Sequence, residues 1–446
     1  MDAFVIRGSR RLSGRLRVHG SKNAALPLLA AALLTSDPVT LRDVPALEDI
    51  HNLLRLLNHL GCVEVEDPKT TGERPQGQRR LRTTDEAQSH APYEIVRTMR
   101  ASICVLGPML AKRGFARVSL PGGCQIGDRP VDLHLRGLEA LGAEIELDSG
   151  DIVARSPVGG LRGASIFLGG PFGSTVLGTA NVMCAATLAK GTTIIEAAAC
   201  EPEIVDLARL LTKMGAKIQG AGSPRLVIEG VRELGGAEHE IIPDRIEAGT
   251  LACAAAITNG ELTLDNCPLD AMMAMRSTLG QAGVHIERID SGPDPMRAVA
   301  RVTSERTLRP VEVTTQPHPG FPTDLQAQLL ALLCLADGNS VVTEKIFPER
   351  FVHVAELSRM GARLLRQGPT VVVSGVRSLI GARVMASDLR ASASLVLAGM
   401  AAQGTTIVDR VYHLDRGYER LDHRLRSVGA DIQRVDDREV AATKGR

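Results

Sequence analysis

The stretch EIVDLARLLTKMGAKIQG, residues 203–220, decides the fold. Its apolar residues recur at helical spacing as far as Met214 and then alternate with polar residues, as they do in a strand. Gly215 stands between the two patterns, where a glycine commonly ends a helix in the left-handed conformation. The stretch therefore predicts an amphipathic helix that leads directly into a strand.

The same signature occurs six times along the 446 residues. The central glycines are 68 to 81 residues apart, and they are Gly61, Gly142, Gly215, Gly283, Gly361 and Gly429. A junction of this kind can arise by chance, but six copies at nearly even spacing indicate a repeat architecture.

A second helical pattern alternates with the first. Its six segments are rich in alanine and apolar on nearly every side: residues 23–34, 101–111, 180–189, 249–257, 325–336 and 391–402. Helices of that composition are buried. Together the two patterns predict an α/β fold of two lobes. Each lobe has three units of buried helix, strand, exposed helix and further strand, and each unit is about 74 residues long.

The composition is that of a soluble globular protein, with 44% hydrophobic residues, 23% charged residues and a net charge of +1. This balance does not indicate a nucleic-acid partner. No signal peptide is apparent, and Gly169 and Pro171 interrupt the longest uncharged run, so we expect a cytoplasmic protein without membrane insertion. The eight cysteines include no C-x-x-C pair, so neither a metal site nor a disulfide framework is predicted.

Polar residues gather where the buried helices begin. Ser21, Thr323 and Ser387 are predicted to be N-caps, because hydroxyls there can accept a backbone N–H. Lys22, Arg100 and Arg390 stand at similar positions, where a cation is unfavourable unless an anion joins it. One interpretation is ordinary capping. The other is a cationic cleft that holds a small phosphorylated ligand with side chains and helix ends.

Several motifs resemble those of a known family. They are GSKNAALP (20–27), YEIVRTMRASI (93–103), SLPGGCQIGDRPVDLH (119–134), EPEIVDLARLL (201–211), PDRIEAGT (243–250), FPTDLQAQ (321–328), ELSRMGA (356–362), SDLRASASLVLAG (387–399) and YHLDRGYERL (412–421). In combination they make the chain similar to the bacterial UDP-N-acetylglucosamine enolpyruvyl transferases. The resemblance implies two inside-out α/β barrels, one of residues 22–242 and one of residues 1–21 plus 243–446. Each barrel has three βαβαββ units around buried helices.

The resemblance also implies an activity, the first committed step of peptidoglycan synthesis. The enolpyruvyl group of phosphoenolpyruvate moves to the 3-hydroxyl of UDP-N-acetylglucosamine, by addition and elimination, and phosphate is released without a cofactor or a metal. The implied catalytic residues are Lys22, Asn23, Cys124 and Asp324. Cys124, on a glycine-rich loop, would protonate phosphoenolpyruvate. Asp324, favoured as an anion at a helix start, would accept the proton of the sugar hydroxyl.

The same resemblance implies the binding residues. Phosphoenolpyruvate would be held by Lys22, Asn23, Arg129, Arg390 and Arg416. The nucleotide sugar would be held by Arg100, Arg129, Pro130, Val131, Asp132, Leu133, Thr175, Val176, Asp324 and Ile346. His134 either contacts uridine or packs in the core. The residues give no indication of an oligomeric state.

Some residues depart from the family pattern or have two interpretations. Leu177, Ala180, Gly173 and Glu349 differ from the residues usual near the nucleotide and sugar. Residues 66–90 are interpreted as a solvated surface loop, with a basic docking segment as the alternative. Cys124 taken by itself could be a core thiol or a reactive one. The cysteines within apolar runs are predicted to lie in the core, namely Cys104, Cys184, Cys253 and Cys334.

Two other functions stay open. A 5-enolpyruvylshikimate-3-phosphate synthase would share phosphoenolpyruvate but bind shikimate 3-phosphate, and the Gly-Gly-Cys loop and the segment RPVDLH (129–134) favour the sugar nucleotide over it. A non-catalytic paralogue would bind the UDP-sugar and regulate wall synthesis. The joint presence of Lys22, Cys124, Asp324 and Arg416 favours an enzyme over this second alternative.

Overall fold

The computed structural model describes residues 2–66, 75–120 and 131–436. Its contacts divide the chain into two units, one of residues 2–19 and 243–436 and the other of residues 20–120 and 131–242. The chain passes from one unit to the other after His19 and again after Ile242. Each unit contains three of the repeats.

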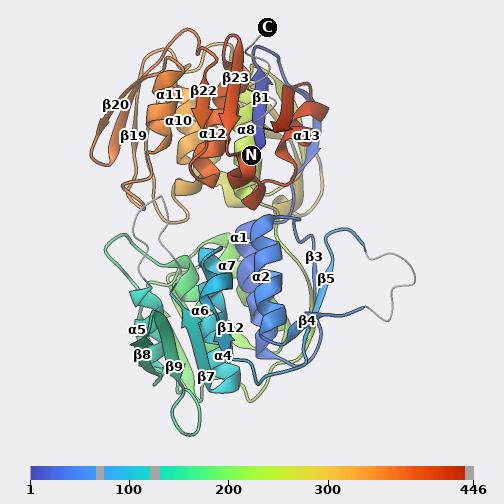
Figure 1. Ribbon diagram of the computed structural model, residues 1–446, viewed down its shortest axis with the longest axis vertical. Helices are drawn as coiled ribbons and strands as arrows, with labels where there is room; N and C mark the ends of the chain where they lie inside the picture. The colour runs from blue at the N-terminus through green and yellow to red at the C-terminus, as the bar shows by residue number, and fades with distance from the viewer. Residues whose placement is uncertain (1, 67–74, 121–130, 437–446) are drawn as a thin grey trace. The chain divides into compact units, whose positions relative to one another are not determined.

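The unit of residues 20–242 has its buried helices inside and its sheets outside (Figure 1). The buried helices are α1 (Lys22–Ala31), α4 (Leu106–Arg113) and α6 (Val176–Ala186), and the outer helices are α2 (Glu48–His59), α5 (Asp132–Ala140) and α7 (Pro202–Lys213). A short helix, α3 (Tyr93–Val96), and the 3-10 turns η1 (Ala32–Leu34) and η2 (Arg100–Val105) adjoin them. The buried helices contact one another directly or through these turns.

Three four-stranded sheets cover these helices within the described part of the unit. In the order of strand pairing they are β14 (Ala237–Glu240), β3 (Val39–Arg42), β5 (Arg79–Thr83) and β4 (Cys62–Glu64); then β6 (His90–Ala91), β7 (Phe115–Ser119), β9 (Asp151–Arg155) and β8 (Glu144–Asp148); then β10 (Ser165–Phe167), β11 (Thr192–Glu196), β13 (Arg225–Glu229) and β12 (Lys217–Gln219). The first strand of each sheet is parallel to the second, and the other pairs are antiparallel.

The unit of residues 2–19 and 243–436 repeats this plan (Figure 1). Its buried helices are α8 (Arg245–Ile257), α10 (Gln326–Leu333) and α12 (Leu389–Ala401), which pack against one another, and its outer helices are α9 (Met273–Gln281), α11 (His353–Arg359) and α13 (Leu421–Ser427). Its sheets are β2 (Ser13–Arg17), β15 (Glu261–Cys267), β17 (Ala298–Ser304) and β16 (Val284–Arg288); β18 (Glu312–Thr314), β19 (Asn339–Thr343), β21 (Thr370–Ser374) and β20 (Arg363–Gln367); β22 (Arg383–Met385), β23 (Thr405–Asp409), β1 (Asp2–Arg7) and β24 (Asp431–Asp436).

The predicted repeat is confirmed at its glycines. All six adopt positive φ between 78° and 107°, and each lies between an outer helix and the strand that follows it. The strand predicted after each buried helix is present as well, in β3, β7, β11, β15, β19 and β23. The expected α/β fold with buried central helices is therefore the fold of this chain.

Distant segments close both units. Strand β1 is antiparallel to both β23 and β24, with Val5 opposite Ile407 and Gln433. Strand β2 lies parallel to β15, and β14 lies parallel to β3. Residues 2–17 thus complete two sheets of the C-terminal repeats, and the last strand of the other unit completes the sheet of its first repeat.

The prediction of a loop over residues 66–90 is wrong in part. Residues 79–83 form β5, the strand between β3 and β4, and Leu81 and Thr83 are buried. The alternation was hidden by three arginines in the segment RRLRT, whose long side chains can lie along a sheet surface with the charge in solvent. Residues 67–74 of this segment lie outside the described residues.

Close packing of α4 against α6 gives a stability prediction. A Cβ atom on Gly107 would lie 2.2 Å from the backbone oxygen of Asn181, whereas a Cβ on Gly280 in α9 would meet open space. We expect Gly107→Ala to lower the free energy of unfolding by about 1–3 kcal/mol or more, since backbone must move. Gly280→Ala is the control, and it should be neutral or raise stability by up to about 1 kcal/mol. Urea unfolding midpoints measure both, and equal midpoints would contradict the packing described.

Candidate functional site

Two arginines and one carboxylate meet where α10 and α12 begin. Asp324 lies in the 3-10 turn η5 (Thr323–Leu325) ahead of α10, and Arg390 lies in the first turn of α12. Arg390 Nη2 is 2.9 Å from Asp324 Oδ2, and Arg350 Nη1 is 2.8 Å from Asp324 Oδ1. Both arginines are buried, with 3% and 5% of their surface exposed, so the carboxylate is held between two desolvated cations.

Arg390 is also held from its other side. Its Nη1 donates to the Tyr418 hydroxyl at 3.1 Å, and its guanidinium lies 5.5 Å from the centre of that ring. Burial lowers the pKa of Arg390, but the attraction of Asp324, Tyr418 and Asp244 outweighs burial and holds the pKa above its ordinary value. The guanidinium is therefore charged and fixed in orientation.

A hydrogen-bond network joins the three buried helices beneath this group. The side-chain nitrogen of Gln328 in α10 lies 3.0 Å from the Thr250 hydroxyl of α8, 3.1 Å from the Tyr418 hydroxyl and 3.0 Å from the backbone oxygen of Asp324, so its two N–H groups are shared among three acceptors. Thr250 and Tyr418 are in turn 2.9 Å apart. The network ties the starts of α8, α10 and α12 together, and it makes the position of Arg390 depend on all three helices.

The predicted N-caps are correct at one helix of three. Ser21 accepts the N–H of Ala24 at the start of α1. Ser387 does not cap α12; Asp388 does, by accepting the N–H groups of Arg390 and Ala391. Thr323 does not cap α10 either.

The physical reason lies in the competing partners. Asp388 offers a charged acceptor one residue closer to the helix than Ser387. The Thr323 hydroxyl is engaged elsewhere, because it donates to Glu344 at 2.8 Å.

Arg416 and Ile346 belong to the same unit as Asp324. Arg416 ends the 3-10 turn η6 (Val411–Arg416), two residues before Tyr418, and it is half-buried. Ile346 follows β19, and its N–H donates to Glu344 at 2.8 Å. Glu349, one of the departures from the family pattern, is exposed and pairs with Arg366 at 2.8 Å.

Lys22 and Asn23 belong to the other unit, at the start of α1. Lys22 is 8% exposed, and its Nζ lies 3.2 Å from Asp49 Oδ2 in the first turn of α2. Arg100 begins η2 and is half-buried. These cations therefore lie at or next to the starts of buried helices, as the sequence predicted for Lys22, Arg100 and Arg390.

His134 lies in the core. It is 5% exposed, and its Nδ1 is 2.8 Å from the side-chain nitrogen of Asn181 in α6. Burial, with a smaller effect of Arg100, lowers the pKa of His134 to about 4, so the ring is neutral at pH 7. Of the two interpretations of this residue, the structure favours packing.

The remaining nucleotide-sugar candidates lie near two helix starts of the same unit. Val131 precedes α5, and Asp132 and Leu133 are its first residues. Thr175 caps α6 by accepting the N–H of Gly178 at 3.2 Å, and Val176 follows it. Leu177 and Ala180, two of the departures from the family pattern, lie on α6 as well, and Ala180 is buried.

Cys124, Arg129 and Pro130 lie outside the described residues. The four cysteines predicted to be core residues are buried, which confirms that prediction. Burial raises the pKa of Cys104, Cys253 and Cys334 to about 12, and it raises that of Cys184 too. Their thiols are therefore poor nucleophiles at neutral pH.

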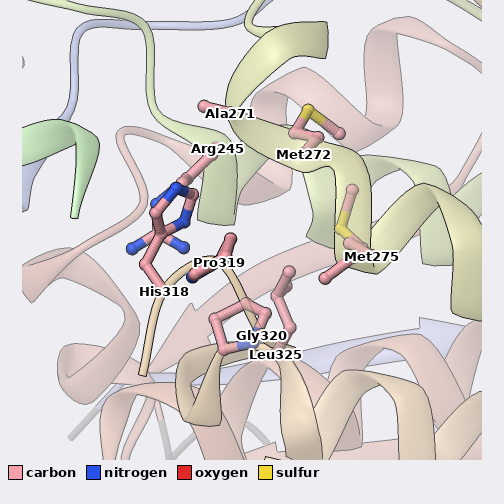
Figure 2. Close-up of a pocket in the computed structure, with 10 residues that line it drawn as sticks. Arg245, Ala271, Met272, Met275, His318, Pro319, Gly320 and Leu325 are labelled. Carbon is pink, nitrogen blue, oxygen red and sulfur yellow. The ribbon is translucent and has the colours of Figure 1, made fainter. Parts of the chain in front are cut away.

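A small cavity lies beside the turn that carries Asp324. Its volume is about 10 Å³, enough for one water molecule at most, and Pro322 and Leu325 are among its lining residues. Figure 2 shows Met272 and Met275 on one side of it and Arg245 and His318 on the other.

Sequence reasoning missed four residues around Asp324: Arg350, Tyr418, Gln328 and Glu344. Gln328 could have been found, since it stands four residues after Asp324 on one helix face. Tyr418 and Arg350 carried no such signal, because each is separated along the chain from the residue it contacts: Arg350 follows β19, and Tyr418 follows β23 and η6. Among the described residues, no cluster of His, Cys, Asp and Glu could hold a metal ion, and no helix has the length and apolar character needed to cross a membrane.

The chain is similar to known proteins over nearly its whole length. The model of the family EPSP synthase (3-phosphoshikimate 1-carboxyvinyltransferase) matches residues 6–425. A UDP-N-acetylglucosamine 1-carboxyvinyltransferase of Methylacidiphilum infernorum is 52% identical over 98% of this chain and 99% of its own length. The chain belongs to the UDP-N-acetylglucosamine 1-carboxyvinyltransferase family. A second member, from Zymomonas mobilis, is 53% identical over 98% of this chain and 100% of its own length.

Solved structures share the fold of this 1-carboxyvinyltransferase family member. The enolpyruvyl transferase NikO from Streptomyces tendae superposes with a TM-score of 0.83 at 24% identity, covering 97% of this chain and 99% of that one. The EPSP synthase of Acinetobacter baumannii gives a TM-score of 0.75 at 17% identity, covering 98% of this chain and 100% of that one. At these identities the likeness shows the fold alone.

Proposed function

We propose that the chain transfers the enolpyruvyl group of phosphoenolpyruvate to the 3-hydroxyl of UDP-N-acetylglucosamine and releases phosphate, as the first committed step of peptidoglycan synthesis in the cytoplasm. The observation that carries the proposal is the Asp324 carboxylate held between the buried guanidinium groups of Arg350 and Arg390. Relatives 52–53% identical over nearly the whole chain support the sugar nucleotide as acceptor.

The arginine pair suits a carboxylated substrate. Each guanidinium presents N–H donors in a planar fork that matches a carboxylate. The Asp324 carboxylate occupies the place between the two forks. A carboxylate of phosphoenolpyruvate that bound there would compete for the same donors. Substrate binding would then release Asp324 to act as a base.

The reaction divides into addition and elimination. In the addition, the sugar hydroxyl oxygen bonds to C2 of phosphoenolpyruvate, Asp324 takes the hydroxyl proton, and Cys124 gives a proton to C3. In the elimination, the C2–O bond to phosphate breaks, C3 loses a proton and the double bond reforms. Lys22, Asn23, Arg129, Arg390 and Arg416 would bind the anionic groups and stabilise the charge that moves onto the phosphate.

The nucleotide sugar would bind along the starts of η2, α5 and α6. Arg100, Asp132 and Thr175 are each at least partly exposed there, and Ile346 would pack against the sugar. Ala180, which is buried in α6, would affect this region through the packing of that helix.

The cysteines bear on where the protein works. The seven cysteines among the described residues are free thiols, which supports the proposal that the protein works in a reducing compartment.

Phosphate release with two acceptors tests the proposal. We expect turnover when phosphoenolpyruvate is mixed with UDP-N-acetylglucosamine, and none when it is mixed with shikimate 3-phosphate. Turnover with shikimate 3-phosphate and none with UDP-N-acetylglucosamine would show that the chain is a 5-enolpyruvylshikimate-3-phosphate synthase. Binding of UDP-N-acetylglucosamine without any phosphate release would favour a non-catalytic regulatory protein.

Cys124 gives a separate prediction. Arg129 is five residues away in the sequence, and a nearby cation favours the thiolate, so we expect a small thiol-directed epoxide such as fosfomycin to label Cys124. Peptide mass spectrometry should find the adduct in the wild type and lose it in Cys124→Ser. Cys104→Ser is the control, since its buried thiol should not react. Undiminished labelling of Cys124→Ser would place the reactive thiol elsewhere.

A further inference from the structure

Glu344 is a buried carboxylate that the proposed mechanism does not use. It follows β19, and none of its surface is exposed. Its Oε1 accepts the Thr315 hydroxyl at 2.7 Å and the N–H groups of Ile346 and Phe347 at 2.8 and 3.0 Å. Its Oε2 accepts the Thr323 hydroxyl at 2.8 Å. A carboxylate buried this completely costs several kcal/mol unless it is well bonded, so its place needs a reason.

The bond to Thr323 has a fixed direction. A threonine hydroxyl has one proton to donate, and an ionised carboxylate can only accept. The proton must therefore point at Glu344. The lone pairs of the oxygen are then free to face the guanidinium of Arg350, whose Nη1 donates to Thr323 Oγ1 at 3.0 Å. That Nη1 also contacts Asp324 Oδ1 at 2.8 Å.

A second contact joins Glu344 to the same guanidinium. The N–H of Phe347 is bonded to Glu344, and the Phe347 ring lies 5.8 Å from the guanidinium carbon of Arg350. The ring supports the guanidinium on one face, and the Thr323 hydroxyl holds it at its edge. Each carboxylate oxygen of Glu344 thus acts on Arg350 through a different neighbour.

We propose that Glu344 is a positioning residue for enolpyruvyl transfer, which orients the Thr323 hydroxyl and thereby sets the Arg350 guanidinium for the carboxylate of phosphoenolpyruvate. The inference rests on the proposed function and deepens it. It assigns no chemistry to Glu344, which touches neither substrate nor reacting atoms. Glu344 acts by deciding which way one hydroxyl proton points.

The alternative is a purely structural role, in which Glu344 only fastens the segment of residues 345–347 to β18. Two variants separate the roles. Glu344→Gln can keep Oε1 for the three donors on that side, but it places an N–H donor opposite Thr323. The hydroxyl must then turn its proton toward Arg350. Thr323→Val removes the hydroxyl at nearly constant volume and leaves the bonds of Glu344 to the segment in place.

Steady-state kinetics with both substrates is the first experiment. For Glu344→Gln and Thr323→Val we expect kcat/KM for phosphoenolpyruvate to fall about tenfold to a hundredfold, the loss expected for one or two hydrogen bonds to a charged group. The KM for UDP-N-acetylglucosamine should change less than twofold. Thr323→Ser, which keeps the hydroxyl, should recover most of the loss. Glu287→Gln is the control, since Glu287 is exposed on β16 and pairs with Arg301 at 2.8 Å, and its kinetics should equal the wild type.

A purely structural role predicts a different result. Thr323→Val would then retain wild-type kinetics, and Glu344→Gln would raise both KM values together with a lower thermal midpoint. Either result would overturn the positioning role. If the wild type released no phosphate from phosphoenolpyruvate with either acceptor, the proposed function would fail, and a crystal structure of Thr323→Val would still test whether Thr323 positions Arg350. If Glu344 and Thr323 position Arg350, its guanidinium should leave Asp324 Oδ1 in that variant. An Arg350 in its wild-type place would refute the positioning role.

Discussion

Replacing Asp324 by asparagine should lower the rate of phosphate release by about 10²–10⁴, the usual contribution of a proton-transfer group. An amide of the same shape cannot take the proton of the sugar hydroxyl. The substitution also removes the negative charge between Arg350 and Arg390, which are 5% and 3% exposed. Because the missing base acts in the chemical step, the loss of rate should appear in kcat. Saturating concentrations of either substrate should not restore the rate.

Folding must be separated from catalysis in this variant. Two buried cations without their shared anion should lower the thermal midpoint of Asp324→Asn, while circular dichroism at 25 °C should match the wild type. Asp265→Asn is the matched control, because Asp265 pairs with the exposed Arg15 at 2.6 Å and such pairs contribute little. Near-wild-type turnover in a folded Asp324→Asn variant would show that Asp324 is not the base.

Arg390→Lys should be almost as damaging, although it keeps the positive charge. Arg390 bonds Asp324 with one terminal nitrogen and Tyr418 with the other, and a single ammonium group cannot reach both with that geometry. We expect kcat/KM for phosphoenolpyruvate to fall about a hundredfold or more, as when a buried, hydrogen-bonded charge loses its partner. The KM for UDP-N-acetylglucosamine should change little.

The control for this variant is Arg15→Lys. Arg15 also donates from two of its nitrogens, to the two carboxylate oxygens of Asp265, but it is exposed, so the exchange should leave both the kinetics and the stability unchanged. Wild-type efficiency with phosphoenolpyruvate in Arg390→Lys would show that charge alone suffices at this position. The fork geometry would then have no part in substrate binding.

Much of the fold could be predicted because it is repeated. One glycine junction such as that at Gly215 is weak evidence, but six copies in phase with six apolar helices leave few other architectures. The closure of the sheets was harder to predict. Strand β1 pairs with β23 and β24 across the whole length of the chain, and no local pattern announces a pairing at that separation.

The candidate site was predictable where a residue lies at a helix start, and not where a residue lies far along the chain from the one it contacts. Lys22 and Arg390 were found because a cation there is costly without an anion. Arg350 and Glu344 lie in the segment after β19, and only the folded chain shows that this segment packs beside Asp324. Thr323 was predicted to be an N-cap because the local sequence gives no sign of Glu344, the acceptor that its hydroxyl bonds instead. Glu344 lies twenty-one residues further along the chain.

The central claim is an addition–elimination in which C3 of phosphoenolpyruvate is protonated and then deprotonated. It is tested most directly by running the reaction with UDP-N-acetylglucosamine in D₂O and examining the product by proton NMR and mass spectrometry. The account predicts an enolpyruvyl ether of the sugar nucleotide that carries deuterium on its vinyl carbon. An ether formed without deuterium, or no ether at all, would contradict it.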